Sequence, residues 1–127
     1  MAYLKYKELS RAFNFRKKIS QIPMFVNQYI ESKEEVLGVY GTRENTCVFT
    51  DRKFILFDIG VLNSKKIHFF PYNKISSSAI EFKFDSVSMY FSFDSGYQTR
   101  INFVHFDSSD KTELRKIYCK MISIVEK

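Results

Sequence analysis

Hydrophobic and polar residues alternate with a period of two along most of the chain after residue 35. From Val87 to Phe93, apolar residues alternate with serine and tyrosine, which is typical of a strand with one face on a core. Phe54-Ile55-Leu56-Phe57 is apolar on both faces, so we expect that strand to be central in its sheet or covered on its outer side. The pattern predicts seven strands, over residues 36–40, 46–50, 53–58, 66–72, 75–84, 87–93 and 99–106.

The last part of the chain changes to the spacing of a helix. Asp110 and Glu113 match a capping box, and they predict a helix that begins there. A single narrow apolar stripe must cover another part of the molecule, and we expect it to close the open end of a strongly bent antiparallel sheet. The stripe consists of Leu114, Ile117, Tyr118, Met121 and Val125.

The first part of the chain predicts helices and carries most of the net charge. Leu9 and Phe13 belong to a roughly helical apolar stripe, and Pro23 fits the first turn of a second helix with Phe25 and Tyr29 on its apolar face. We therefore expect residues 1–33 to form a basic amphipathic helical extension and residues 34–127 to form the domain. The formal net charge is +6, and residues 1–18 hold six basic residues against Glu8 alone: Lys5, Lys7, Arg11, Arg16, Lys17 and Lys18.

Several short stretches of the domain resemble the bacterial pleckstrin-homology-like (PH-like) family. They are Glu34-Glu35-Val36-Leu37, the run from Val48 to Asp58, Lys65-Lys66 and the corner Pro71-Tyr72-Asn73-Lys74-Ile75-Ser76. The resemblance spans about residues 34–124 and does not include the helical segment before them. It implies a mainly β (α+β) fold, with seven strands in a two-sheet antiparallel half-open barrel capped by a C-terminal helix. It also implies assembly through the sheets, although a fold of this kind hosts many functions.

Patterns that mark common catalytic and metal sites do not occur in the sequence. His68 and His105 are far apart, Cys47 and Cys119 form no CxxC pair, and no nucleophile elbow or phosphate-binding glycine loop is present. We expect a protein that is no enzyme and uses no metal, cofactor or small-molecule substrate. Both cysteines lie in apolar segments and make no disulfide framework, so we expect buried free thiols. The connection over residues 41–45 holds a single arginine beside a glutamate, too little for a polyphosphate headgroup.

Three functions remain open. The leading hypothesis is an interaction module that self-associates or docks a protein partner, with Leu9, Phe13, Phe25 and Tyr29 as its candidate assembly face. The first alternative is a membrane-surface adaptor, whose six basic residues between Lys5 and Lys18 contact an anionic lipid surface weakly. The second is an inhibitor of a host protein encoded by a phage or mobile element. Nucleic acid ranks last as a partner, because the basic residues are confined to one short stretch.

The sequence also bears on location. No apolar run exceeds four residues, and no secretion signal is recognised at the N-terminus. We expect a cytoplasmic protein, with a peripheral position at the inner membrane surface under the adaptor hypothesis.

Overall fold

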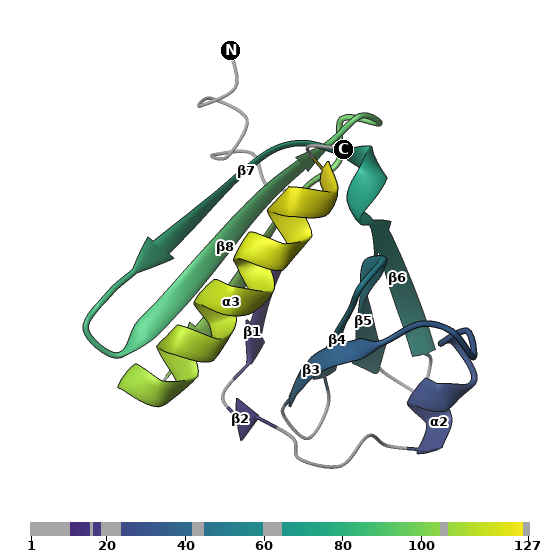
Figure 1. The fold of residues 1–127 in the computed structure, drawn as a ribbon, viewed down its shortest axis with the longest axis horizontal. Helices are drawn as coiled ribbons and strands as arrows, with labels where there is room; N and C mark the ends of the chain where they lie inside the picture. The colour runs from purple at the N-terminus through teal and green to yellow at the C-terminus, as the bar shows by residue number, and fades with distance from the viewer. Residues whose placement is uncertain are drawn as a thin grey trace.

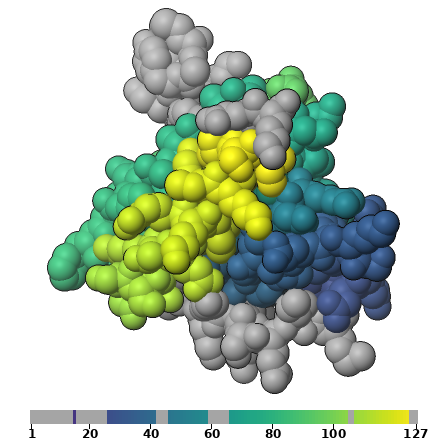
Figure 2. All heavy atoms as spheres, viewed as in Figure 1, coloured from purple at the N-terminus to yellow at the C-terminus, as the bar shows by residue number. Residues whose placement is uncertain are grey.

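Two β-sheets face each other, and a long C-terminal helix lies across one open side between them (Figure 1). The computed structural model describes residues 11–15, 17–18, 24–41, 45–59, 65–104 and 107–125. Figure 2 shows the helix, α3 (Ser108–Val125), crossing this face in yellow with a sheet on either side of it. The arrangement is a half-open barrel with a capping helix, as the sequence predicted.

Within the described residues, the strands form a four-stranded sheet in the order β1-β9-β8-β7 and a five-stranded sheet in the order β2-β3-β4-β5-β6. Neighbouring strands are antiparallel except β1 and β9, which are parallel. A short 3₁₀ turn, η2 (Tyr72–Lys74), connects the two sheets. The strands are β1 (Arg11–Phe15), β2 (Lys17–Lys18), β3 (Val36–Gly41), β4 (Asn45–Thr50), β5 (Lys53–Ile59), β6 (Lys65–Pro71), β7 (Ile75–Phe82), β8 (Ser86–Phe93) and β9 (Gln98–Val104).

The seven strands predicted from the alternation are confirmed as β3 to β9, with ends that differ by at most a few residues. The alternation works because each of these strands turns one face to a common core. Phe49, Phe54 and Phe91 are fully buried there, together with Phe103 from β9. Ring pairs such as Phe54–Phe91, with centroids 4.9 Å apart, fill the space between the sheets.

The helix predicted over the first part of the chain is wrong at residues 11–15 and 17–18. Residues 11–15 form β1, which pairs in parallel with β9, and residues 17–18 form β2, which pairs with β3. Phe15 is fully buried against Phe103, with ring centroids 6.0 Å apart. The spacing of Phe13 and Phe15 fits the period of a strand as well as that of a helix. The long-range pairing with β9 decides in favour of the strand. The predicted second helix is present as the single turn α2 (Met24–Asn27).

The outer face of the five-stranded sheet is covered by the segment that begins at α2. Val26 is fully buried, and Tyr29 and Ile30 pack with it over the outward side chains of the sheet. Ile55 and Phe57 of β5 lie in this second cluster, whereas Phe54 and Leu56 face the core. The two apolar faces of β5 are thereby explained, as the sequence predicted.

Helix α3 packs the predicted stripe against the barrel from Leu114 to Met121, and the side chain of Val125 lies outside the described residues. Leu114, Ile117 and Met121 are buried against the barrel, and Tyr118 is half-buried. The helix comes so close to β3 that a Cβ atom at Gly38 would lie 2.9 Å from Ile117 Cδ1. A glycine at this position therefore permits the packing of the helix on the sheet.

Two details of α3 correct the sequence analysis. The helix begins at Ser108, and its capping residue is Asp107, whose Oδ1 accepts the Asp110 N–H at 2.9 Å. Asp110 is thus the third helical residue and not the cap, and its own carboxylate faces the Asp107 N–H at 3.4 Å. Cys119 is exposed, because it lies off the buried stripe, whereas Cys47 is buried as expected.

Among the described residues, no helix is both long and apolar enough to span a membrane.

Candidate functional site

The candidate site residues from the sequence lie mostly where the structure gives no side-chain description. Lys5, Lys7, Leu9 and Arg16 lie outside the described residues. The backbone, without side-chain detail, is described for Arg11 and Phe13 in β1, Lys17 and Lys18 in β2, and Phe25 in α2. The roles proposed for these residues in assembly or in contact with an anionic surface therefore stay predictions.

Tyr29 is the one residue of the candidate assembly face whose side chain is described. It is half-buried, and its ring contacts Phe57 and Phe69 with centroid separations of 5.6 and 5.8 Å. These contacts hold the α2 segment on the outer face of the chain's own sheet. The Tyr29 ring therefore makes contacts within its own molecule.

The residues that carry the sequence resemblance form a buried corner. The Lys53 ammonium lies 2.8 Å from Glu34 Oε1, and the Thr50 hydroxyl donates to the other carboxylate oxygen. The Tyr72 hydroxyl donates to the Thr50 carbonyl oxygen at 2.8 Å. Together these bonds join the start of β3, the β4–β5 turn and η2. The matching residues therefore stabilise the fold.

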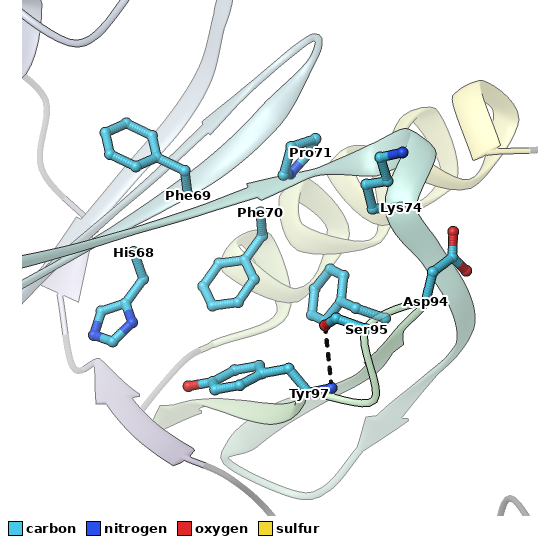
Figure 3. A pocket seen from close by; sticks show the side chains of 9 residues that line it. His68, Phe69, Phe70, Pro71, Lys74, Asp94, Ser95 and Tyr97 are labelled. Atoms are coloured by element: carbon cyan, nitrogen blue, oxygen red, sulfur yellow. Dashed lines mark hydrogen bonds between the residues drawn. The ribbon is translucent and has the colours of Figure 1, made fainter.

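A pocket of about 390 Å³ opens beside this corner, between the edge strand β6, η2 and the β8–β9 turn (Figure 3). The side chains of Phe70 and Tyr97 point into the same space, with ring centroids 5.6 Å apart (Figure 3). Phe93 stacks on Phe70 at 4.9 Å, and the His68 ring lies parallel to Phe70 at 6.2 Å. The wall of the pocket is therefore an extension of the aromatic core that reaches the surface where the barrel is open.

The local sequence explains why these rings converge. His68 and Phe70 are two residues apart on β6 and so share one face, while Phe69 points to the opposite face (Figure 3). On the other side, Gly96 has a φ of 94°, a conformation that suits glycine, and its N–H donates to the Phe93 carbonyl oxygen at 2.9 Å. This turn brings Tyr97 back beside Phe93, and the Phe93 N–H donates to the Tyr97 carbonyl oxygen at 3.0 Å.

The rim of the pocket carries one charge of each sign. Lys74 of η2 and Asp94 of the β8–β9 turn are both exposed, and the Asp94 N–H donates to the Lys74 carbonyl oxygen at 2.9 Å. The Tyr97 N–H donates to Ser95 Oγ at 3.3 Å. An aromatic wall with a small polar rim suits an apolar side chain, whose neighbouring residues can meet the rim charges.

Sequence reasoning missed this site. It placed Phe70, Phe93 and Tyr97 on strands or at a turn, but the pairing that brings β6 opposite the β8–β9 turn is not a local property. The available signal was the aromatic Tyr97 directly after the turn Asp94-Ser95-Gly96.

Among the described residues, no group of three or more His, Cys, Asp or Glu side chains is placed to hold a metal ion.

Comparison with known proteins gives a consistent result. The family model described as "Bacterial PH domain" matches residues 7–125, so the match begins well before residue 34, where the sequence resemblance was expected to start. The early start agrees with the pairing of β1 and β2 into the sheets. No curated protein matches this chain.

Three solved structures show the likeness in three dimensions. A protein with a pleckstrin-homology domain from Shewanella loihica has a TM-score of 0.65 at 18% identity, over 89% of this chain and 98% of that one. A PH domain-containing bacterial protein from Exiguobacterium sibiricum has a TM-score of 0.60 at 16% identity, over 79% of this chain and 55% of that one. A pleckstrin homology domain from Shewanella amazonensis has a TM-score of 0.50 at 20% identity, over 73% of this chain and 78% of that one. At these identities the likeness concerns the fold.

Proposed function

Because this chain belongs to the bacterial PH domain family, we propose that it is a protein-interaction module whose pocket beside β6 takes an apolar side chain of a protein partner. PH-like domains generally mediate protein or lipid interactions and are generally not enzymes. The convergence of Phe70, Phe93 and Tyr97 at the surface is the observation that carries the proposal. Aromatic walls that already pack on one another need little reordering on binding, which favours affinity.

The chemistry of the pocket favours binding over catalysis. Among the described residues, His68 is the one imidazole that lines it, and its ring stacks on Phe70. The carboxylate and the ammonium at the rim, Asp94 and Lys74, are exposed to solvent. We therefore propose a non-enzymatic role.

The proposal is tested with a small neutral aromatic probe, N-acetyl-phenylalanine amide, added to the isotope-labelled protein and followed by NMR. We expect concentration-dependent shifts confined to the amide signals of β6, η2 and the β8–β9 turn. N-acetylglycine amide, which lacks the ring, serves as the matched control compound and should cause none of them. The shifts should be lost in Tyr97→Glu, which places a carboxylate in the aromatic wall.

Two further variants make the result interpretable. His68→Glu changes the opposite wall and replaces Tyr97→Glu if that variant does not fold. Phe82→Ser removes a partly exposed ring that does not line the pocket and should leave the shifts intact. Shifts of equal size with the glycine compound, or shifts that persist in both pocket variants, would contradict the proposal.

A further inference from the structure

The turn between β7 and β8 presents a phenylalanine to solvent. Phe84 is 97% exposed, whereas the other phenylalanines of this hairpin, Phe82, Phe91 and Phe93, are 42%, 0% and 7% exposed. A single exposed apolar residue is common on protein surfaces and by itself carries no conclusion. The residues around Phe84 indicate that it takes part in binding.

Phe84 is held in place. The Lys83 N–H donates to the Ser86 carbonyl oxygen at 2.8 Å and closes the turn. The Lys111 ammonium, from α3, donates to the carbonyl oxygens of Lys83 and Phe84 at 2.5 and 2.6 Å. The turn is therefore tied to the capping helix at the point where Phe84 projects. Because the backbone of the turn is already fixed, binding of Phe84 by a partner needs little further ordering of the backbone.

The same chain also carries a pocket suited to such a ring. An apolar cavity of about 150 Å³ holds benzene, and the pocket lined by Phe70, Phe93 and Tyr97 has a volume of about 390 Å³. The turn and the pocket lie at opposite ends of β8, because Phe84 precedes that strand and the Asp94–Tyr97 turn follows it. Eight residues of strand span about 26 Å at about 3.3 Å per residue. Phe84 therefore cannot reach the pocket of its own molecule.

The charges beside the ring and the pocket match. Phe84 stands between Lys83 and Asp85, both exposed, and the pocket rim holds Lys74 and Asp94. In one of the two orientations of the turn, an inserted Phe84 brings Asp85 toward the Lys74 ammonium and Lys83 toward the Asp94 carboxylate, and the inference takes this orientation. The existing ion pair of Lys83 with Glu81, at 3.7 Å and half exposed, is weak and easily exchanged.

We infer that Phe84 of one molecule inserts into the aromatic pocket of a second copy of the same chain. The inference rests on the proposed function of the pocket and names its occupant. The contact joins two different surfaces of the molecule. The assembly is then either a two-fold dimer with two such contacts or a closed ring in which Phe84 of each copy enters the pocket of the next copy.

Sedimentation velocity of the full chain over a wide range of concentration tests the inference. We expect the wild-type chain to associate as concentration rises. Phe84→Asp should raise the dissociation constant at least about 30-fold, the loss typical of a central interface residue. Phe84→Leu, which keeps an apolar side chain, should raise it less. Phe82→Ser, which removes a partly exposed ring of β7 and not of the turn or the pocket, should leave association unchanged.

Mixing two defective chains gives the sharper test. The Phe84→Asp chain keeps an intact pocket, and the Tyr97→Glu chain keeps an intact Phe84. Each chain alone should sediment as a monomer, and an equimolar mixture should form a one-to-one dimer and nothing larger. If Tyr97→Glu does not fold, His68→Glu takes its place. Failure of the mixture to form a dimer would overturn the inference.

Other outcomes separate this inference from the proposed function. A wild-type chain that stays monomeric but binds the phenylalanine probe overturns the inference and leaves the pocket's function standing. Association that is lost in Tyr97→Glu and kept in Phe84→Asp would also overturn the inference and leave the function of the pocket standing, because another segment would then occupy the pocket. A wild-type monomer that co-sediments with phosphatidylcholine–phosphatidylglycerol vesicles, while the Phe84→Asp chain does not, would overturn the inference. Phe84 would then contact a membrane and not a second copy of the chain.

Discussion

The Lys53 ammonium lies 2.8 Å from a carboxylate oxygen of Glu34, whose side chain is fully buried. Glu34 stands just before β3 and Lys53 begins β5, so the pair joins two segments that are 19 residues apart. The backbone N–H of Glu31 donates to the same oxygen at 3.1 Å. This carboxylate is therefore the centre from which the α2 segment and the β4–β5 turn are held together.

Removal of one partner of this pair should destabilise the domain. Glu34→Ala leaves the Lys53 ammonium, 18% exposed, without its carboxylate, and we expect the free energy of unfolding to fall by about 3 kcal/mol. The double variant Glu34→Leu/Lys53→Met buries no charge and should lose less. Denaturant unfolding of the three proteins measures both effects. A double variant less stable than Glu34→Ala would show that the pair is not the cause.

The same carboxylate predicts a dependence of stability on pH. Burial alone would raise the pKa of Glu34, but hydrogen bonds from Lys53, Thr50 and the Glu31 N–H outweigh it, and the pKa lies below the ordinary 4.5. The folded protein then binds this proton less readily than the unfolded chain. The stabilisation is complete above about pH 4.5 and is lost as the pH falls through the folded pKa.

Unfolding midpoints measured from neutral to acidic pH test this expectation, and Glu34→Gln should show a shallower acid loss than the wild type. The pKa of Asp107 is also lowered, chiefly because the Asp110 N–H donates to its carboxylate, so Asp107 contributes with the same sign. Asp107→Asn is therefore the control that separates the two groups. Equal slopes in the wild type and in Glu34→Gln would refute the assignment to Glu34.

Truncation of the buried face of α3 should be costly. Ile117 and Met121 are 5% and 0% exposed, and replacing either with Ala should lower the free energy of unfolding by about 2–5 kcal/mol. Lys116→Ala, on the exposed face of the same helix, should change it little. Thermal or denaturant unfolding gives the comparison. A small loss at Met121 would mean that α3 detaches readily from the barrel in solution.

The two cysteines should react in sequence. Cys119 is exposed and should be alkylated in the native protein, whereas burial raises the pKa of the Cys47 thiol and shields it. Mass spectrometry should show one modification under native conditions and two after denaturation. Reduction should leave the mass unchanged, because both thiols are free. Rapid native modification of both would show that the β4 environment opens.

The basic residues at the start of the chain distinguish assembly from contact with an anionic surface. Changing Lys5, Lys7, Lys17 and Lys18 to Gln should leave the assembled mass unchanged in light scattering if apolar contacts drive association. Under the alternative, the same changes should abolish co-sedimentation with anionic vesicles, and that binding should fall steeply from low to moderate salt. A wild-type monomer that sediments with such vesicles at physiological salt would favour the alternative.

The sequence by itself determined the elements whose pattern is local. The alternation from Val87 to Phe93 and the stripe from Leu114 to Met121 each repeat with the period of one kind of structure, and one buried face per element suffices to specify them. The two-sided apolar run in β5 likewise predicted a second layer, which the segment after α2 supplies. These features depend on which face of an element is buried and not on which partner buries it.

Only the tertiary structure decided the features that depend on which other segment of the chain packs against an element. Phe15 belongs to a strand because β9 lies beside it, although its local spacing also suits a helix. Asp107 caps α3 because its carboxylate reaches the Asp110 N–H, while the sequence offers a second acidic pair one turn later. The pocket exists because closure of the barrel brings Phe70 of β6 to Tyr97 after β8. Residues so far apart in sequence share no period, so their meeting follows from the sheet order and the bends that join the sheets.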